Sequence, residues 1–291
     1  KQKLTLALIL TCILIETILA YDIVRGSSET LALWHMDEIY TSEASGKDTF
    51  AILGGNPPPT LVEGKFGKAL SFDGENFLYV QMTPSLYAPE EVTLEAWIYI
   101  NSFKDVEYNN IIAIAYRAGL EWQSVTRICG IALKPSQHPG KGFLRGYVYT
   151  DREHFNEIMT TEPLIPSNKW IHVAFTRSLS TGMHLYVDGK EVDVKVTQGV
   201  RNPRGNIIMG TEIFFGHDAE IIIDEPRMCD VALDPSQLLL KGTLELAVSR
   251  TEIDIGSNML LAITIAAVAF AAAWLLRRVI QTWGMSSRSK E

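Results

Sequence analysis

Cysteine is scarce in this sequence, with three among 291 residues. Cys12 lies in the first hydrophobic segment, which leaves Cys129 and Cys229 for the rest of the chain. Their spacing fits no metal-binding motif, so they can form one disulfide in an oxidising compartment or remain two separate buried thiols. The chain also has no Asn-x-Ser/Thr sequon, so we expect no N-linked glycosylation of the common form.

Positive charge is in deficit as well. The net charge of the chain is −8, and its two ends are basic: the first twenty residues carry +1 and residues 277–291 carry +3. The middle of the chain therefore carries −12. Because an acidic surface repels phosphate backbones, we expect no nucleic-acid partner. Such a surface suits calcium, a cationic partner or simple solubility.

One long apolar run lies near the C-terminus. Residues 259–276 read MLLAITIAAVAFAAAWLL and are followed by Arg277 and Arg278. Because roughly eighteen to twenty helical residues span a hydrocarbon core of about 30 Å, this run predicts a transmembrane helix in contact with membrane lipid. The arginines place residues 277–291 in the cytoplasm and everything before the helix outside. Residues 243–258 would form a juxtamembrane linker.

A second apolar stretch, residues 4–15, follows Lys1 and Lys3. It is typical of a secretory signal peptide, with Ala20 as the small residue before cleavage. Alternatively, residues 1–20 are retained as a membrane anchor. In both interpretations residues 21–29 form a linker, and the middle of the chain is extracytoplasmic. The chain crosses the cell membrane once if the segment is cleaved and twice if it is retained.

Between these segments, short runs of alternating hydrophobicity predict β-strands. They are residues 69–72, 77–80, 93–100, 170–176, 183–187, 190–196, 207–209 and 220–223. Asp188-Gly189 and Asp73-Gly74 predict hairpin turns between the runs that flank them. A single helical turn is expected at residues 234–240, with Asp234 as N-cap and Pro235 at the first helical position. Many short strands indicate a sandwich or a barrel.

Six segments resemble a known family in their order. They are residues 31–38, 64–74, 93–97, 170–174, 185–189 and 223–227. Together they resemble the laminin-G/pentraxin-like group of the concanavalin A-like lectin/glucanase superfamily, over residues 30–242. The resemblance implies an all-β jelly-roll sandwich of two antiparallel sheets, one flat and one curved, with Trp34, Trp97 and Trp170 in the framework.

The resemblance also implies a structural Ca²⁺, bound by a carboxylate of the final strand and by oxygens near the first strand. Asp224 takes the position of that carboxylate, and Asp37, Glu38 and Asp73 are further candidates. Calcium prefers six to eight oxygen ligands, which carboxylates and backbone carbonyls supply. The alternative is that these aspartates cap turns through side-chain hydrogen bonds.

A glycan site in this fold would combine aromatic platforms with a few polar groups. Two stretches, residues 116–122 and 147–154, offer both. The candidate residues are Tyr116, Arg117, Trp122, Tyr147, Tyr149, Asp151 and Arg152. Tyr147 and Tyr149 would share one face of a strand. Aromatics at alternate strand positions are equally well explained by packing.

Catalytic motifs are absent from the domain. Glucanases of this fold carry Glu-x-Asp-x-x-Glu on one strand. Glu252 and Asp254 match the first two positions, but Ser257 replaces the last and the segment lies beyond the domain. We therefore expect no enzyme, but a membrane-anchored recognition or adhesion module that binds a glycan or another surface protein. The alternative is an accessory subunit of a membrane or envelope complex, for which the alanine-rich surface of residues 259–276 would pack against other helices. A glycoside hydrolase is the third and least favoured interpretation, and it would need two convergent carboxylates in a cleft.

Overall fold

The computed structural model describes residues 30–38, 51–117 and 125–240. The predicted signal or anchor, both linkers, the predicted transmembrane helix, the tail and Trp122 lie outside these ranges. Within them, no helix has the length and apolar character that a membrane crossing requires.

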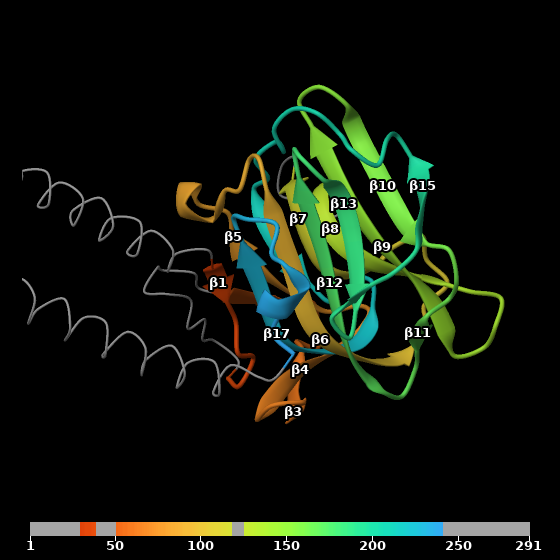
Figure 1. The fold of residues 1–291 in the computed structure, drawn as a ribbon. Coiled ribbons are helices and arrows are strands. Elements are labelled where there is room, and N and C mark those ends of the chain that lie inside the picture. The colour runs from red at the N-terminus through yellow and green to blue at the C-terminus, as the bar shows by residue number, and fades with distance from the viewer. Residues whose placement is uncertain (1–29, 39–50, 118–124, 241–291) are drawn as a thin grey trace, which may run out of the picture. The chain divides into compact units, whose positions relative to one another are not determined.

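Two antiparallel sheets pack face to face and form the domain (Figure 1). Sheet A contains β1 (Thr30–Leu33), β3 (Thr60–Glu63), β4 (Lys68–Asp73), β6 (Val92–Ser102), β12 (Trp170–Ser178), β13 (Gly182–Val187), β14 (Lys190–Glu191) and β17 (Glu220–Cys229). Their order across the sheet is β14-β13-β12-β6-β17-β4-β3, and β1 also pairs with β17.

The strands of sheet B follow a similar long path. They are β2 (Ala51–Gly54), β5 (Phe77–Gln81), β7 (Asn109–Arg117), β8 (Val125–Pro135), β9 (Lys141–Thr150), β10 (His154–Thr160), β11 (Ile165–Pro166), β15 (Val194–Gln198) and β16 (Glu212–Phe215). Their order is β15-β10-β9-β8-β7-β16-β5-β2, with β11 beside β9. The predicted all-β sandwich is confirmed.

The core lies between the two sheets and follows from the two-residue period of the strands. In β12, Ile171, Val173 and Phe175 point inward, and all three join the main hydrophobic cluster. Trp34 packs edge-on against Phe215 at 4.9 Å between ring centroids and is almost fully buried. The alternation that predicted the strands is therefore the alternation between core and outer face.

The two predicted hairpins differ in outcome. Asp188 and Gly189 adopt φ values of 48° and 73° and join β13 to β14, so the first hairpin is confirmed. The second is wrong, because β4 belongs to sheet A and β5 to sheet B. Gly74 turns the chain from one sheet to the other, so the same Asp-Gly pair serves a crossover instead of a hairpin.

Three other elements depart from the sequence pattern. The run 190–196 is split into β14 and β15, which belong to different sheets. In the run 207–209, Ile207 forms one isolated bridge to Thr150, and the run itself forms no strand. The predicted helical turn is present as η2 (Pro235–Gln237), capped by Asp234, but it ends before Leu238. A second turn, η1 (Pro84–Leu86), had no sequence signal.

The outer face of sheet A is covered by the end of the described chain. Residues 230–240, here called the C-terminal cover, place Leu233 and Leu238 against Ala174 and Tyr186 of β12 and β13. The indole N–H of Trp97 donates to the Leu239 carbonyl at 2.8 Å. Trp97 is thus buried beneath the cover, not between the sheets.

The C-terminal cover also seals a group of charges. Glu95 has no exposed surface and accepts hydrogen bonds from Arg227 and from the Leu239 N–H, the latter at 2.9 Å. His172 Nε2 lies 2.9 Å from the same carboxylate. Burial alone would raise the pKa of Glu95, but the His172 hydrogen bond and the Arg227 charge hold it below its ordinary value.

The two cysteines of the domain are free thiols, so the disulfide alternative is wrong. Cys129 belongs to the core cluster between the sheets, whereas Cys229 joins the small cluster under the C-terminal cover. Because a disulfide needs Cα atoms within about 7 Å and converging Cβ atoms, thiols in these two layers cannot meet. Burial raises the pKa of each to about 12, so both stay protonated.

Candidate functional site

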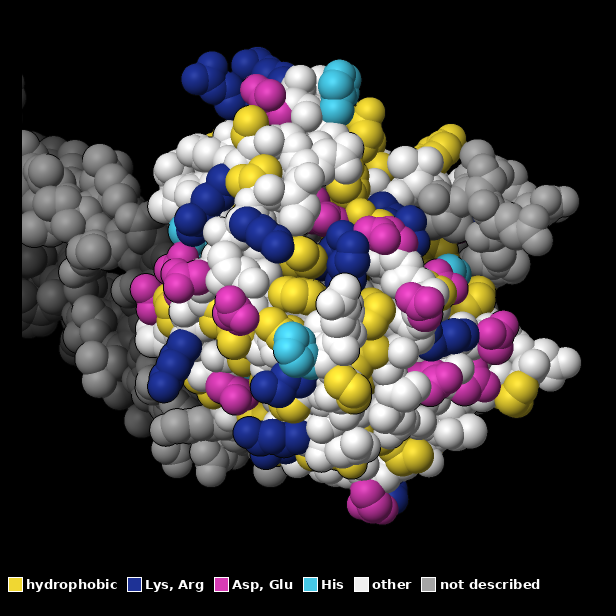
Figure 2. All heavy atoms as spheres, turned by 90° about the vertical axis from the view of Figure 1, so that its right-hand side faces the viewer, with side chains coloured by type: hydrophobic (Ala, Val, Ile, Leu, Met, Phe, Trp, Pro, Cys, Tyr) yellow, Lys and Arg dark blue, Asp and Glu magenta, His cyan; other side chains and the backbone are white. Residues whose placement is uncertain are grey.

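The outer face of sheet B carries a group of aromatic and charged side chains. Strand register places Tyr147 of β9 opposite Glu157 of β10, and Tyr149 opposite Phe155. We call this group the basic–aromatic face. Its members are Tyr108, Arg127, Phe143, Arg145, Tyr147, Tyr149, Phe155 and Glu157. Seen from the side of β10, β15 and β11, Lys and Arg side chains are interspersed with hydrophobic ones (Figure 2).

Small residues form the base of this face. Ala113 of β7 is paired with Gly130 of β8, and Tyr147 lies next to Gly130 on β9. A Cβ on Gly130 would come within 2.3 Å of the Tyr147 hydroxyl, so the glycine leaves room for the ring. The hydroxyl donates to Asn110 Oδ1 at 3.3 Å. Tyr147 is therefore fully buried although it points away from the core.

Tyr108 packs above Tyr147, at 5.6 Å between ring centroids in an edge-to-face arrangement. Two guanidinium groups lie within cation–π distance of its ring: Arg127 at 4.2 Å and Arg145 at 4.7 Å from the centroid. Phe155 stacks on Tyr147 at 5.7 Å. Tyr108, Arg127 and Phe155 keep partly exposed surface, so they are available to a ligand.

Glu157 is the acceptor at the centre of the face. It receives hydrogen bonds from the hydroxyls of Tyr108 at 2.7 Å and Thr197 at 2.5 Å, and Arg145 Nη2 lies 3.3 Å away. Burial and the Glu157 hydrogen bond raise the pKa of Tyr108, so its hydroxyl remains a donor. Arg145 also binds Glu107 at 2.9 Å, which links two carboxylates through one guanidinium.

Two carboxylates on one face raise the question of glycoside hydrolysis. Such catalysis requires one carboxylic acid that stays protonated near neutral pH. The hydrogen bond from Arg145 instead lowers the pKa of Glu107, and the Glu157 oxygens both accept hydroxyl hydrogen bonds. The pair is arranged as counter-ions to Arg145, and neither group is set up as a proton donor.

A second aromatic group lies on the same outer face, beyond β7. Phe77, Tyr79 and Phe214 pack together with Ala113, and His217 contacts the rings of Phe77 and Phe214. Phe77 and Phe214 are buried, whereas Tyr79 is partly exposed. This group extends the apolar floor from β8 toward β5.

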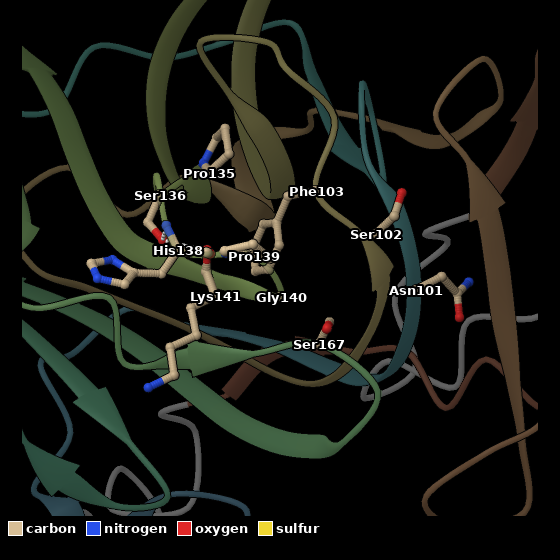
Figure 3. Close-up of a pocket in the computed structure, with 10 residues that line it drawn as sticks. All are labelled: Asn101, Ser102, Phe103, Pro135, Ser136, His138, Pro139, Gly140, Lys141 and Ser167. Atoms are coloured by element: carbon tan, nitrogen blue, oxygen red, sulfur yellow. Dashed lines mark hydrogen bonds between the residues drawn. The ribbon is translucent and has the colours of Figure 1, made fainter.

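One pocket of about 300 Å³ lies near the β8–β9 turn (Figure 3). Phe103 and Pro139 lie at its centre, and the His138 and Lys141 side chains point away from Phe103. The Ser136 hydroxyl already donates within the turn, to the Lys141 carbonyl at 2.9 Å. The Ser136 hydroxyl is thus engaged in holding the turn, and the His138 and Lys141 side chains do not converge on the pocket, so the basic–aromatic face is the better candidate site.

A laminin-G family model, described as the concanavalin A-like lectin/glucanases superfamily, matches residues 73–238. The chain belongs to this superfamily. No protein among the curated ones matches its sequence.

Solved structures share the fold of this laminin-G-like domain at low identity. One is Domain 4 of AbnA, a GH43 extracellular arabinanase from Geobacillus stearothermophilus. The domain was solved in complex with arabinotriose. The two structures have a TM-score of 0.52 and 19% sequence identity, over 72% of this chain and 96% of that one. The binding domain of Paraclostridial Mosquitocidal Protein 1 has a TM-score of 0.51 and 17% identity, over 72% of this chain and 50% of that one. The binding domain of botulinum neurotoxin serotype C1 has a TM-score of 0.50 and 17% identity, with the same coverage of 72% and 50%. This chain spans about half the length of the two toxin domains.

Two of the predicted calcium ligands hold a hairpin of the laminin-G-like domain. Asp224 Oδ2 accepts the N–H of Phe66 at 2.8 Å, and Asp37 Oδ1 accepts the N–H of Lys68 at 2.6 Å. Asp224 Oδ1 is buried without a hydrogen bond, which is the one observation in favour of a cation. Burial raises the pKa of Asp224 to about 7, and the charge of nearby Glu225 adds to the effect.

The other two predicted ligands do not join them. Asp73 Oδ1 accepts the N–H groups of Glu75 and Asn76, so it caps a turn. Asp73 is paired with Glu220, about 13 Å along β17 from Asp224. Glu38 is exposed. In the described part of the chain, no three acidic, histidine or cysteine side chains are placed to hold a metal ion. Calcium at Asp224 and Asp37 stays a prediction.

The predicted glycan residues are spread over two regions. Tyr149 lies on the basic–aromatic face and is partly exposed, whereas buried Tyr147 supports that face from below and is not a contact residue. Asp151 Oδ1 accepts the N–H of Asn206 at 2.9 Å, which gives it a role in holding a loop. Arg152 is exposed in the turn after β9.

The two remaining described candidates lie at the end of β7. Tyr116 is 49% exposed, and Arg117 forms an ion pair with Glu212 at 2.7 Å. Sequence reasoning missed Tyr108, Arg127 and Phe155. Alternation along β10 could have indicated Phe155 beside Glu157, but Tyr108 and Arg127 reach the face from a loop and from a bulged part of β8, for which no local pattern exists.

Proposed function

We propose that this domain is a non-catalytic glycan-binding module and that the basic–aromatic face is its binding site. The observation that carries the proposal is the difference between the two outer faces. The C-terminal cover packs on sheet A, whereas on sheet B Tyr108, Tyr149 and Phe155 remain partly exposed beside arginines. Sugar rings present apolar C–H faces that pack on aromatic rings, and guanidinium groups donate to hydroxyls.

Two further observations support the proposal. The chain belongs to a superfamily described as lectins and glucanases, and the AbnA domain of this fold was solved with arabinotriose. The absence of a proton-donating carboxylate at Arg145 favours binding over hydrolysis.

We further propose that the module is displayed outside the cell membrane and anchored by residues 259–276, whose apolar length and flanking arginines favour this topology. Carbonate washing of membranes should leave the full chain in the pellet. Protease added to intact cells should degrade the domain, and survival of the domain under that treatment would reject the topology.

The glycan site is tested with the full chain purified in mild detergent. Binding to a panel of neutral and acidic oligosaccharides is measured by calorimetry for the wild type and for Tyr108→Ala and Phe155→Ala. Each substitution should weaken binding about tenfold, because it removes a stacking surface. Tyr99→Ala is the matched control, since Tyr99 is a partly exposed aromatic on the outer face of the other sheet.

The same preparation addresses the accessory-subunit alternative. Native mass in mild detergent should correspond to the chain alone or to a simple homo-oligomer. Stoichiometric membrane subunits that co-purify, together with no glycan binding, would reject the glycan-module proposal in favour of that alternative.

A further inference from the structure

The arginines on the outer face of sheet B differ in their counter-charges. Arg145 forms ion pairs with Glu107 and Glu157, and Arg117 pairs with Glu212. The Arg127 side chain forms no ion pair and no hydrogen bond with any residue of the described ranges. Its Nε atom is buried without an acceptor. The face therefore contains one guanidinium whose charge is not balanced by a contacting carboxylate.

Arg127 is also held in place without a counter-ion. It lies on β8 opposite Ala115, and its guanidinium is 4.2 Å from the centre of the Tyr108 ring. Stacking on an aromatic ring fixes the plane of a guanidinium and leaves its N–H edge free for a planar acceptor. The nearby Asp218 carboxylate is engaged with His217 Nδ1 at 2.8 Å. An oriented cation of this kind is a preformed partner for a carboxylate.

We infer that the glycan bound by this face is acidic, and that Arg127 binds the carboxylate of a uronic or similar sugar acid whose ring packs beside Tyr108 and Phe155. The inference rests on the proposed function and adds to it the chemical class of the ligand. Partial burial strengthens the ion pair, because Arg127 is only partly accessible to water.

The charge of the whole domain limits the kind of acidic ligand. Residues 30–242 carry a net charge of −9, so a long polyanion is repelled at a distance. One unpaired arginine matches one carboxylate at a time. A short oligosaccharide with isolated carboxylates fits this arrangement, and a phosphate polymer does not.

The experiment compares ligands that differ only in charge. Trigalacturonic acid, its methyl ester and other uronic trisaccharides with their esters are titrated into the full chain in mild detergent. The wild type should bind at least one acid about 10- to 100-fold more tightly than its ester, as a charged hydrogen-bonded pair requires. Arg127→Gln should remove this preference and leave ester binding unchanged.

Two further variants separate charge from geometry. Arg127→Lys retains the charge but loses the planar fork, so it should restore part of the preference. Arg204→Gln is the matched control, because Arg204 is an exposed arginine that is not a member of the basic–aromatic face, and it should leave the preference intact.

The outcomes distinguish the inference from the proposed function. Equal binding of acids and esters by the wild type, with sensitivity to Tyr108→Ala, would overturn the inference and leave the glycan site standing. An acid preference that survives Arg127→Gln would also overturn it. If neither acids nor esters nor neutral sugars bind, the proposed function itself falls.

Discussion

Tyr108 joins several parts of the candidate site through one side chain. Its ring supports two arginines and rests on Tyr147, while its hydroxyl donates to the buried carboxylate of Glu157. These partners come from three strands, β8, β9 and β10. A residue with so many contacts influences stability as well as ligand binding, so the two effects need separate measurements.

Tyr108→Phe should lower the free energy of unfolding by about 1–2 kcal/mol, because Glu157 loses one hydrogen-bond donor while the ring stays in place. Chemical denaturation measures the change. Stacking of a glycan should persist in this variant. A loss of binding equal to that of Tyr108→Ala would mean that the hydroxyl, not the ring, contacts the ligand.

The buried charges under the C-terminal cover predict a larger effect. Arg227→Met should cost about 3–5 kcal/mol in denaturation experiments, because it leaves the fully buried Glu95 without its cation. The exposed pair Arg201–Glu191 is the comparison, and Arg201→Met should cost under about 1 kcal/mol. Adding Glu95→Gln to Arg227→Met should recover part of the loss.

At the scale of elements, the β3–β4 hairpin is fastened by carboxylates. Asp224 on β17 holds the N–H of Phe66, and Asp37 after β1 holds the N–H of Lys68. The hairpin therefore joins the beginning and the end of the domain. One of these carboxylates, Asp224, is buried enough to titrate near neutrality.

This titration predicts a pH dependence of stability. The pKa of Asp224 is about 7 in the folded state and about 4 when unfolded, so the folded state binds the proton more tightly. The contribution to the free energy of unfolding is largest below about pH 4 and is lost as the pH rises to about 7. Thermal melts of wild type and Asp224→Asn should agree most closely near pH 4, where the protonated carboxyl resembles the amide, and should diverge toward pH 7, where the wild type loses stability.

Bound calcium would reverse this pH dependence of stability. An ion at Asp224 requires the ionised carboxylate, so calcium should raise the melting temperature of the wild type at pH 8 and leave Asp224→Asn unaffected. No response of the wild type to calcium or to a chelator at that pH would reject the calcium prediction.

The elements that could be predicted from the sequence are those with a local cause. The alternation in β6 and β12 and the two positive φ angles at Asp188 and Gly189 follow from neighbouring residues. The crossover at Asp73-Gly74 does not, because the choice of sheet depends on which strands are already paired. The candidate site likewise depends on residues that are distant in sequence. Its sequence-predicted member Tyr149 lies on β9, but Arg127 and Tyr108 reach it through tertiary packing.

At the scale of the whole molecule, the sandwich has one closed face and one open face. The C-terminal cover seals sheet A, while sheet B presents aromatic and basic side chains to the solvent. The two free thiols belong to different layers of this arrangement, one in the core and one beneath the cover.

The separation of the thiols predicts that reduction has no effect on stability. The melting temperature should agree within about 1 °C with and without a reductant. A disulfide that closed a loop of about 100 residues would contribute about 4–5 kcal/mol, and its reduction would lower the melting temperature by about 10 °C or more. A shift of that size would contradict the assignment of free thiols.

The place of β17 has a consequence for the newly made chain. Among the described residues this strand is the last in sequence, yet it lies inside sheet A between β6 and β4 and also pairs with β1. Until it has been synthesised, at about 5–20 residues per second, nothing joins β6, β4 and β1 within sheet A. A nascent chain that stalls before Glu220 would expose unpaired strand edges, which quality-control proteases and chaperones recognise. Sheet A can therefore be completed only after translation has passed Cys229.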